Sequence, residues 1–501
     1  MKPLLLAFLA GLAAACGFEP WALWPLTLLG FAALLWLIAA APGLWTALAR
    51  GWAFGVGHFV LGLNWIATAF TYQSAMPAWL GWVAVVLLSL YLAVYPAMAA
   101  GLTWRYGRAH PLALVLWFAA AWIVTEWLRA TMFTGFAWNP AGVALLPTPV
   151  ARLAAWTGTY GLSGVAMLLA GAALLAVRRH WRSAGAVAGT VAAASALTFI
   201  AAPAPPATEV AVRIVQPNIG QQDKWRPGFA AEILERLGSL SMSSGDGPRL
   251  LLWPEAAVTE PLADDRPGAL PQVARTRRQV QRLVGPRDLL LAGGLTVRST
   301  DGLTVSSGTN SVFAIDGSGT ILGRYDKAHL VPYGEYLPMR PILSAIGLSR
   351  LAPGDMDFDP GPGPQTLDLP LVGRVGFQLC YEIIFSGEVV DRANRPNFLF
   401  NPSNDAWFGA WGPPQHLAQA RLRALEEGLP VIRSTPTGIS AVIDSDGRLL
   451  HSIPMGAQAF IDARLPAPKA PTLFARFGNL LPMLLALALA AGAIAVARKA
   501  R

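Results

Sequence analysis

The sequence predicts a bundle of about eight membrane helices joined to an α/β domain. Hydrophobic residues make up 54% of the 501 residues and charged residues only 13%, which is far below the charged share of a typical soluble domain. Apolar runs near the roughly 20 residues that span a bilayer recur through the first 200 positions. From 203 to 475, short β-rich runs alternate with polar helical stretches, which is typical of an α/β fold.

Eight apolar runs are expected to form membrane helices: 3–17, 21–41, 52–71, 79–101, 112–130, 158–177, 184–202 and 479–497. The chain therefore divides into seven helices over 1–202, an α/β domain over 203–475, and a last helix with a basic tail over 476–501. "APAPPATE" leads into the α/β domain, and "LPAPKAPTLFARFGN" leads out of it.

The distribution of lysine and arginine predicts how the chain crosses the membrane, because these residues favour cytoplasmic loops. If the N-terminus is inside, Arg129 and Arg152 lie in short outside loops. The inside segments then hold a much larger basic set: Lys2, Arg50, Arg105, Arg108, Arg178, Arg179, Arg182, Arg498, Lys499 and Arg501. Both termini are expected in the cytoplasm and the α/β domain outside, in the periplasm of a bacterium with two membranes.

The two cysteines lie in different parts of the chain. Cys16 closes the first apolar run and Cys380 lies in the α/β region, so Cys380 is predicted to be a free thiol. The start "MKPLLLAFLAGLAAACGF" also resembles a lipoprotein signal peptide that is cleaved before Cys16. Ala13 stands where leucine is usual, and further apolar runs follow at once, which favours a plain first helix.

The α/β region reads as strands, helices and turns in alternation. Strands are expected in "EVAVRIVQPN", "RLLLWPEAAV", "DLLLAGGLTV", "NFLFNPSNDAWFG" and, as a pair, "PVIRSTPTGISAVIDSDGRLL". Helices are expected in "PGFAAEILERLGSLS", "RTRRQVQRLVG" and "QHLAQARLRALEEG". "TNSVFAIDGSGTILGRYDK" predicts a hairpin that turns at Asp316-Gly317. "GRVGFQLCYEIIFSGEVVDRA" predicts a strand, an elbow and a helix.

Three residues stand at the ends of strand-like runs, namely Glu255, Lys327 and Cys380. Such ends open into the active-site crevice of many α/β sheets. A helix that starts at the cysteine would favour its thiolate, a carboxylate can take the thiol proton, and an ammonium can stabilise an oxyanion. The three together suit acyl transfer through a thioester. Taken singly, each has an ordinary structural explanation as a buried thiol, a helix cap or a solvated charge.

Further carboxylates stand near these residues. Glu335 in "PYGEY" is expected to orient Lys327 or hold an attacking amine, and Glu382 beside the cysteine is a second acid or a satisfied ion-pair partner. Glu126 and Arg129 lie at the outer end of the fifth apolar run, at a helical spacing that allows an ion pair. They are expected either to form a structural pair or to bind lipid headgroups or the incoming protein.

Several function classes are not indicated by the sequence. No His/Cys group has the spacing of a metal site, no glycine-rich phosphate loop is present, and no basic run carries interleaved aromatics. No metal, cofactor or nucleic-acid partner is therefore expected. His329 is interpreted as structural, and His58, Asn64 and Tyr72 are weaker candidates for a role in the membrane part.

The motifs resemble those of a known family. "WPE", "YDKAHLVPYGEYLP" and "CYEIIF" are similar to the Glu, Lys and Cys signatures of the nitrilase superfamily. With the apolar runs, "TEWLRATMFTGFAWNP", "VQPNIGQQDKW" and "GPPQHLAQARLRALEEGLPVIRSTPTGIS", the whole chain resembles the bacterial apolipoprotein N-acyltransferases. Departures are Tyr333, Gly220 and Pro436, where the family more often has Phe, Pro and Asn.

The resemblance implies an αββα sandwich on eight membrane helices of the bacterial inner membrane. It implies Glu255 as general base, Lys327 as oxyanion stabiliser and Cys380 as nucleophile. It also implies supporting roles for Glu335, Tyr381, Glu382 and Trp225. The implied reaction transfers an acyl chain from a membrane phospholipid, through a Cys380 thioester, to the α-amine of a diacylglyceryl-cysteine on an apolipoprotein.

Two other functions are compatible with the motifs. A membrane-tethered amidase or nitrilase would use the same three residues, with water in place of the amine, although a soluble substrate does not require membrane helices. A transporter or scaffold with an inactive enzyme domain would not require an intact set of Glu255, Lys327 and Cys380.

Overall fold

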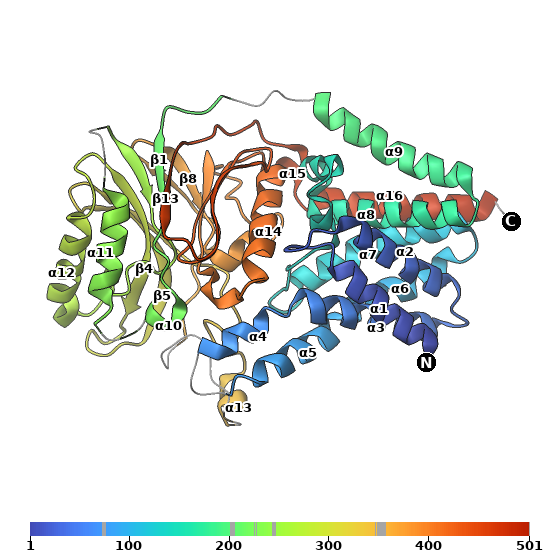
Figure 1. Ribbon diagram of the computed structural model, residues 1–501, viewed down its shortest axis with the longest axis horizontal. Helices are drawn as coiled ribbons and strands as arrows, with labels where there is room; N and C mark the ends of the chain where they lie inside the picture. The colour runs from blue at the N-terminus through green and yellow to red at the C-terminus, as the bar shows by residue number, and fades with distance from the viewer. Residues whose placement is uncertain are drawn as a thin grey trace.

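The structure is a computed structural model that describes residues 1–72, 77–200, 206–224, 226, 228–242, 247–345, 347 and 357–499. A helical bundle and a β-sandwich lie side by side, with α14 (Gly412–Glu427) between them (Figure 1). Helices form at all eight apolar runs: α1 (Lys2–Ala15), α2 (Trp24–Ala39), α3 (Leu44–Gly62) with α4 (Ile66–Ala69), α5 (Leu80–Leu92) with α6 (Val94–Gly107), α7 (Pro111–Thr131), α8 (Ala154–Val177), α9 (Trp181–Ile200) and α16 (Leu480–Lys499).

Not every helix is long enough to cross a bilayer by itself. In the described part of the chain, four helical segments have the necessary length and composition: Leu80–Gly107, Pro111–Thr131, Pro149–Val177 and Leu480–Lys499. Leu44–Gly62 and Ile66–Tyr72 would make a fifth as one span bent by 50°. α1 and α2, with 14 and 16 residues, are shorter than the roughly 20 residues of a straight span, so the eight predicted spans are confirmed as helices but not all at full length.

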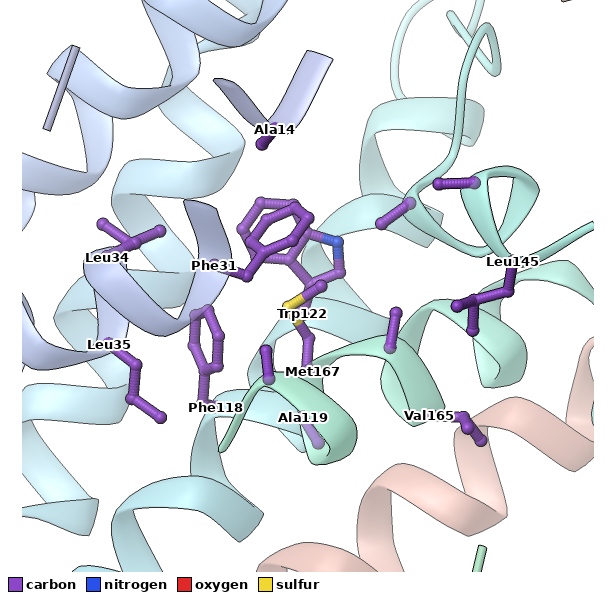
Figure 2. Packing of buried hydrophobic residues seen from close by; sticks show 14 of the residues in the cluster. Ala14, Phe31, Leu34, Leu35, Phe118, Ala119, Trp122, Leu145, Val165 and Met167 are labelled. Atoms are coloured by element: carbon purple, nitrogen blue, oxygen red, sulfur yellow. The ribbon is translucent and has the colours of Figure 1, made fainter. Parts of the chain in front are cut away.

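The bundle is held together by aromatic and small side chains from α1, α2, α3, α7 and α8. The ring of Phe31 lies edge-on to Trp122, with 4.8 Å between ring centroids, and Phe54 and Phe118 pack beside them. Figure 2 shows this cluster, with Phe31 and Leu34 of α2 facing Phe118 and Trp122 of α7. Both ends of the chain lie at the end of the bundle away from the sandwich (Figure 1).

The sandwich consists of two sheets. The first has the order β13 (Ala459–Arg464), β1 (Ala211–Gln216), β2 (Arg249–Leu252), β4 (Leu289–Arg298), β5 (Ser307–Asp316) and β6 (Ile321–Asp326), with β3 (Ala263–Asp264) beside β4. The second has the order β12 (Leu449–Ile453), β11 (Ser440–Ile443), β10 (Val431–Ser434), β9 (Phe398–Pro402), β8 (Gly373–Phe377) and β7 (Thr366–Leu369). Both sheets mix parallel and antiparallel pairs.

Alternating side chains place helices on the outer faces of the two sheets. On β2, Leu250 and Leu252 pack between the sheets, whereas Leu251 packs with Ile233 of α11 (Ala230–Ser241) and Val280 of α12 (Leu270–Gln281). On the second sheet, Val431 and Leu399 face the cluster that contains Ala420 and Ala424 of α14. The predicted αββα sandwich is confirmed.

The helix predicted after the Cys380 elbow does not form. β8 leads into a single 3-10 turn, η5 (Cys380–Ile384), which ends at Phe385. Gly387 adopts a left-handed φ of 83°, and the carboxylate of Asp391 accepts hydrogen bonds from two following backbone N–H groups. Both features favour turns over a continuing helix. The remaining short elements are η1 (Phe70–Tyr72), η2 (Ala141–Leu145), η3 (Pro149–Leu153), α10 (Gln221–Lys224), η4 (Pro267–Ala269), α13 (Arg340–Ala345), η6 (Asp405–Phe408) and α15 (Leu473–Phe477).

Candidate active site

The structure brings Glu255, Lys327 and Cys380 together from both sheets. Glu255 lies in the turn after β2, Lys327 directly follows β6, and Cys380 opens η5 after β8. All three are buried, and Cys380 is a free thiol as predicted. The Nζ of Lys327 lies 3.7 Å from Oε1 of Glu255. The strand ends therefore converge on one water-poor site, as the sequence predicts.

The backbone at this site is held in unusual conformations. Cys380 has a φ of 49° and Ala256, next to Glu255, a φ of 45°, both in the left-handed region that side chains rarely adopt. The turn that carries Glu255 also lies directly against Gly293 of β4. A Cβ at Gly293 would lie 2.4 Å from the carbonyl oxygen of Pro254, so only glycine permits this approach. Such strained positions occur where the surrounding structure imposes them, often at active sites.

Two neighbours bond the carboxylate of Glu255, and a third bonds its backbone. Oε1 accepts a 2.7 Å hydrogen bond from Nδ2 of Asn310, and Oε2 accepts a 2.7 Å bond from the backbone N–H of Asn404. Lys224 donates to the backbone carbonyl of Glu255 at 3.0 Å. No local pattern in the sequence points to these three neighbours. Lys224 lies in "VQPNIGQQDKW" and Asn404 in "NFLFNPSNDAWFG". Their spacing along the chain does not reveal that they contact Glu255.

Lys327 is held in place by a second carboxylate. Its Nζ lies 3.0 Å from Oε1 and 2.9 Å from Oε2 of Glu335, and Asn310 donates to both Glu255 and Glu335. Burial alone would lower the pKa of Lys327, but the charges of Glu335 and Glu255 outweigh it, and the net effect raises the pKa. The surroundings of Lys327 therefore favour its ammonium form, and Glu335 lies where it can orient this group.

The surroundings of Cys380 disfavour its thiolate form. Burial raises its pKa well above the ordinary value, the charge of Glu255 raises it further, and Lys327 opposes this only in part. The expectation that a helix dipole would favour the thiolate is wrong, because η5 has five residues and 3-10 geometry. The cysteine therefore needs a base to become a nucleophile, and Glu255 is the neighbouring carboxylate.

We expect the alkylation of Cys380 by iodoacetamide to be slow at pH 7–8 and still rising above pH 9, because the folded site retains the thiol proton beyond the ordinary pKa of 9.0. In a Glu255→Gln variant the profile should move to lower pH, since one cause of the raised pKa is gone, while acyl transfer falls. The measurement is the rate of mass labelling against pH in a Cys16→Ser background, with urea-unfolded protein as reference. A folded profile that rises at lower pH than the unfolded one would contradict this assignment.

Glu382 fastens the nucleophile elbow to the loop that follows Lys327. Its carboxylate accepts hydrogen bonds from the backbone N–H groups of Leu379, Ala328 and His329, at 2.7, 2.8 and 3.0 Å, and from the hydroxyl of Tyr325 at 2.9 Å. Burial raises the pKa of Glu382, and these hydrogen bonds oppose the shift. Glu382 thus has no ion-pair partner among these contacts and serves to position two of the three candidate catalytic groups.

A Glu382→Gln substitution should lower the rate of Cys380 acylation by roughly 10- to 100-fold and destabilise the fold by about 2–3 kcal/mol. The amide nitrogen of glutamine is a hydrogen-bond donor. It cannot accept the hydrogen bonds that backbone N–H groups donate to the carboxylate of Glu382. Acylation is measured by intact mass and stability by thermal unfolding. The matched control is Glu232→Gln on α11, where the carboxylate pairs with Arg236 on the surface. Equal rates in the two variants would contradict the role of Glu382.

The remaining predicted residues fall into different environments. The hydroxyl of Tyr381 donates to the backbone carbonyl of Gly135 at 3.3 Å, so its ring faces the bundle side of the site. Glu126 and Arg129 are buried in α7, with 3.9 Å between Oε1 of Glu126 and NH2 of Arg129. No described contact joins them to the side chains of the proposed catalytic triad, Glu255, Lys327 and Cys380. Their burial favours the structural interpretation over binding of lipid headgroups. Trp225 lies outside the described residues. The ring of His329 contacts the carbonyl of Thr134 and the rings of Tyr381 and Phe385, and its backbone N–H donates to Glu382.

A buried polar cluster that the sequence analysis missed lies beneath Cys380. Ligand atoms of Cys380, Asp405 and His416 lie within 4.8 Å of one another, which is a geometry that could hold a metal ion. Arg433 is bonded to both oxygens of Asp405 at 2.6 Å and contacts Nδ1 of His416 at 3.0 Å. The positive charge of the Arg433 guanidinium disfavours the binding of a metal cation to Asp405 and His416. Nε2 of His416 donates to the backbone carbonyl of Cys380 at 3.0 Å, so the cluster supports the elbow.

Comparison with known proteins identifies the two parts of the chain. Residues 211–468 match the family model of carbon-nitrogen hydrolases, and the buried cysteine, carboxylate and ammonium on an αββα sandwich place the domain in this nitrilase-type class. Residues 10–172 match the family model of the apolipoprotein N-acyltransferase N-terminal domain. The chain belongs to the apolipoprotein N-acyltransferase family.

The relatives cover nearly the whole chain. The apolipoprotein N-acyltransferase of Rhodopseudomonas palustris is 36% identical over 96% of this chain and 92% of its own length. That of Sinorhizobium medicae is 37% identical over 93% of this chain and 90% of its own length. Among solved structures, Nit3 of Saccharomyces cerevisiae, a member of branch 10 of the nitrilase superfamily, aligns with 56% of this chain and 98% of its own, with 16% identity and a TM-score of 0.38.

Proposed function

We propose that this chain transfers a fatty acyl chain from a membrane phospholipid to the α-amino group of the N-terminal diacylglyceryl-cysteine of apolipoproteins. The observation that carries the proposal is the buried set of Glu255, Lys327 and Cys380 in a sandwich packed directly on apolar helices. A lipid donor and a lipidated acceptor both reside in a membrane, and a sandwich packed on apolar helices is suited to act on such substrates.

The first half-reaction forms the thioester. Glu255 takes the proton of Cys380, and the thiolate attacks the ester carbonyl of the phospholipid. The charge that develops on the carbonyl oxygen is stabilised by the ammonium of Lys327. The ester C–O bond then breaks, Glu255 returns the proton to the departing alkoxide, and a lysophospholipid leaves. Because the site is buried, water has little access to the thioester.

The second half-reaction consumes the thioester. The neutral α-amine of the acceptor attacks the same carbonyl, and Glu255 takes a proton from the nitrogen. The C–S bond breaks, the proton passes to the Cys380 thiolate, and an amide is released with the enzyme restored. Glu335 keeps Lys327 in place through both steps, since it holds the ammonium at 2.9 Å.

A route for lipid is supported by exposed apolar side chains beside the site. Phe133 is 84% exposed and directly precedes Thr134 and Gly135, whose carbonyls contact His329 and Tyr381. Tyr333 and Met339, in the segment after Lys327, are also exposed. An apolar rim of this kind suits contact with acyl chains rather than with water.

The proposed location is the bacterial inner membrane, with residues 203–475 in the periplasm and both termini in the cytoplasm. Support comes from the excess of Lys and Arg in the predicted inside segments and from the two chain ends, which both lie on the part of the bundle away from the sandwich (Figure 1). Protease added outside intact spheroplasts should cleave the sandwich. Full protection of the sandwich, with cleavage only after lysis, would reverse the orientation.

The deciding experiment is the intact mass of the purified protein after incubation with phospholipid and no acceptor. A gain of one acyl chain on Cys380, removed by hydroxylamine, would support the thioester. Chasing this species with a diacylated lipopeptide or with buffer alone separates a transferase from a hydrolase. Rapid loss of the adduct in buffer, together with turnover of small amides without lipid, would favour an amidase instead.

A further inference from the structure

The loop between α7 and η2, residues 132–140, connects the membrane bundle to the active site. On its sandwich side, the carbonyl of Thr134 accepts a 2.9 Å hydrogen bond from Nε2 of His329, two residues after Lys327. The carbonyl of Gly135 accepts the hydroxyl of Tyr381, the neighbour of Cys380, at 3.3 Å. One membrane-borne loop therefore contacts the segments that carry two of the three proposed catalytic side chains.

The same loop reaches the elbow by a second path. The indole N–H of Trp138 donates to Oε1 of Gln415 at 2.8 Å, and its ring lies against His416, with 5.2 Å between ring centroids. His416 in turn donates to the backbone carbonyl of Cys380 at 3.0 Å. Cys380 has a left-handed φ and depends on such contacts to keep its geometry.

On its membrane side, the α7–η2 loop is fastened by Arg129 and Glu126. NH1 of Arg129 donates to the carbonyls of Phe136 and Trp138, at 2.9 Å each. Oε1 of Glu126 accepts the backbone N–H of Ala141 at 2.9 Å. Both side chains are nearly fully buried, where charge-assisted hydrogen bonds to backbone are strong and specific in geometry.

From these contacts we infer that Arg129, with Glu126 as its partner, is a positioning residue for acyl transfer that acts through the α7–η2 loop. It sets the carbonyls of this loop against the Lys327 and Cys380 segments, so the membrane bundle completes the active site as well as anchoring it. The inference rests on the proposed function, because its readout is acylation of Cys380.

Gly135 offers a second way to displace the loop. It has a φ of 72°, and a Cβ would lie 2.2 Å from the carbonyl oxygen of Ala130 and 3.1 Å from Cε1 of Phe385. Phe385 packs on both His329 and Tyr381. A Gly135→Ala substitution should therefore move the carbonyl that Tyr381 binds without changing any charge.

The test compares Arg129→Lys and Gly135→Ala with two matched controls. Arg129→Lys keeps the charge but loses the planar fork that reaches two carbonyls. Arg50→Lys changes another buried arginine, which donates to the carbonyl of Leu37 at 2.5 Å and does not contact the loop. Gly189→Ala adds a Cβ on α9 where nothing lies within 4 Å.

The rate of Cys380 acylation by phospholipid vesicles is measured by intact mass over a range of lipid concentrations, together with thermal unfolding. We expect the maximal rate to fall at least tenfold in both test variants, with the half-saturating lipid concentration changed less than twofold and both controls within twofold of wild type. The pH profile of Cys380 alkylation should also shift in the test variants, which a purely stabilising role would not cause.

Folded Arg129→Lys and Gly135→Ala proteins that acylate within twofold of the wild-type rate would overturn the inference. Failure of both variants to fold would also overturn it, because the loop would then serve folding rather than positioning. If only one variant folds, the inference is overturned when that variant acylates Cys380 within twofold of the wild-type rate. Absence of acylation in the wild-type protein would instead contradict the proposed function, so the two failures are distinguishable.

Discussion

Replacing Cys380 with alanine is expected to lower acyl transfer by at least roughly 10³-fold, because no other group can form the thioester. The side chain is buried, and its loss leaves only a small cavity, so the fold should lose no more than about 1–2 kcal/mol. Cys380→Ser is the matched variant that keeps a hydroxyl in the same place, and it should be inactive too, since a serine hydroxyl is a much weaker nucleophile. Transfer to a diacylated lipopeptide is measured in vesicles.

Growth of a strain depleted of its own transferase gives an independent readout for Cys380→Ala. Wild-type growth and lipoprotein acylation with this variant would contradict the thioester mechanism. Such a result would favour a scaffold or transporter function for the membrane bundle. Retained folding of the variant in membranes is the necessary control.

The second large effect is expected for Lys327→Met, which should slow formation of the thioester by roughly 10²–10³-fold, or about 3–4 kcal/mol. The methionine keeps the length of the side chain and removes the charge that stabilises the oxyanion. It also leaves Glu255 and Glu335 without their shared cation, although Asn310 still bonds both. The measurement is the rate of Cys380 acylation with excess phospholipid.

Two further variants separate catalysis from stability at Lys327. Lys327→Met/Glu335→Gln also removes the negative charge that Lys327 balances in the native site, and it should recover thermal stability but not the acylation rate. Lys469→Met is the control, since this lysine pairs with Asp446 and contacts none of the triad side chains. Acylation at the wild-type rate in Lys327→Met would remove Lys327 from the proposed mechanism.

Much of the fold was predictable from local patterns in the sequence. The short apolar runs in "RLLLWPEAAV" and "DLLLAGGLTV" placed β2 and β4, and the long apolar runs placed all eight helical regions, because both signals depend on residues close along the chain. The helix predicted after Cys380 was wrong, since the chain leaves helical geometry at Phe385, and Gly387 and the Asx turn at Asp391 follow. The length of α2 was also overestimated, because apolar composition does not mark where a helix ends.

The site was predictable in part for the same reason. Glu255, Lys327 and Cys380 lie in distinctive motifs at strand ends and Glu335 in the loop after Lys327, and the structure brings these four together. Asn310 and Arg433 were missed because their roles depend on partners far away in the chain. Glu382 was found by its place beside Cys380, but its attachment to the Lys327 loop comes from a contact across 54 positions.

The sequence by itself determined the class of the protein, its helices and strands, and the residues that carry the chemistry. Only the tertiary structure decided how those residues are held: the strained elbow at Cys380, the support from His416, and the α7–η2 loop fastened by Arg129. The apolar cluster that contains Cys380 combines side chains of the bundle, such as Trp65 and Trp138, with those of the sandwich. Such contacts are invisible to local patterns, because packing and hydrogen bonds depend on distances in space and not on spacing along the chain.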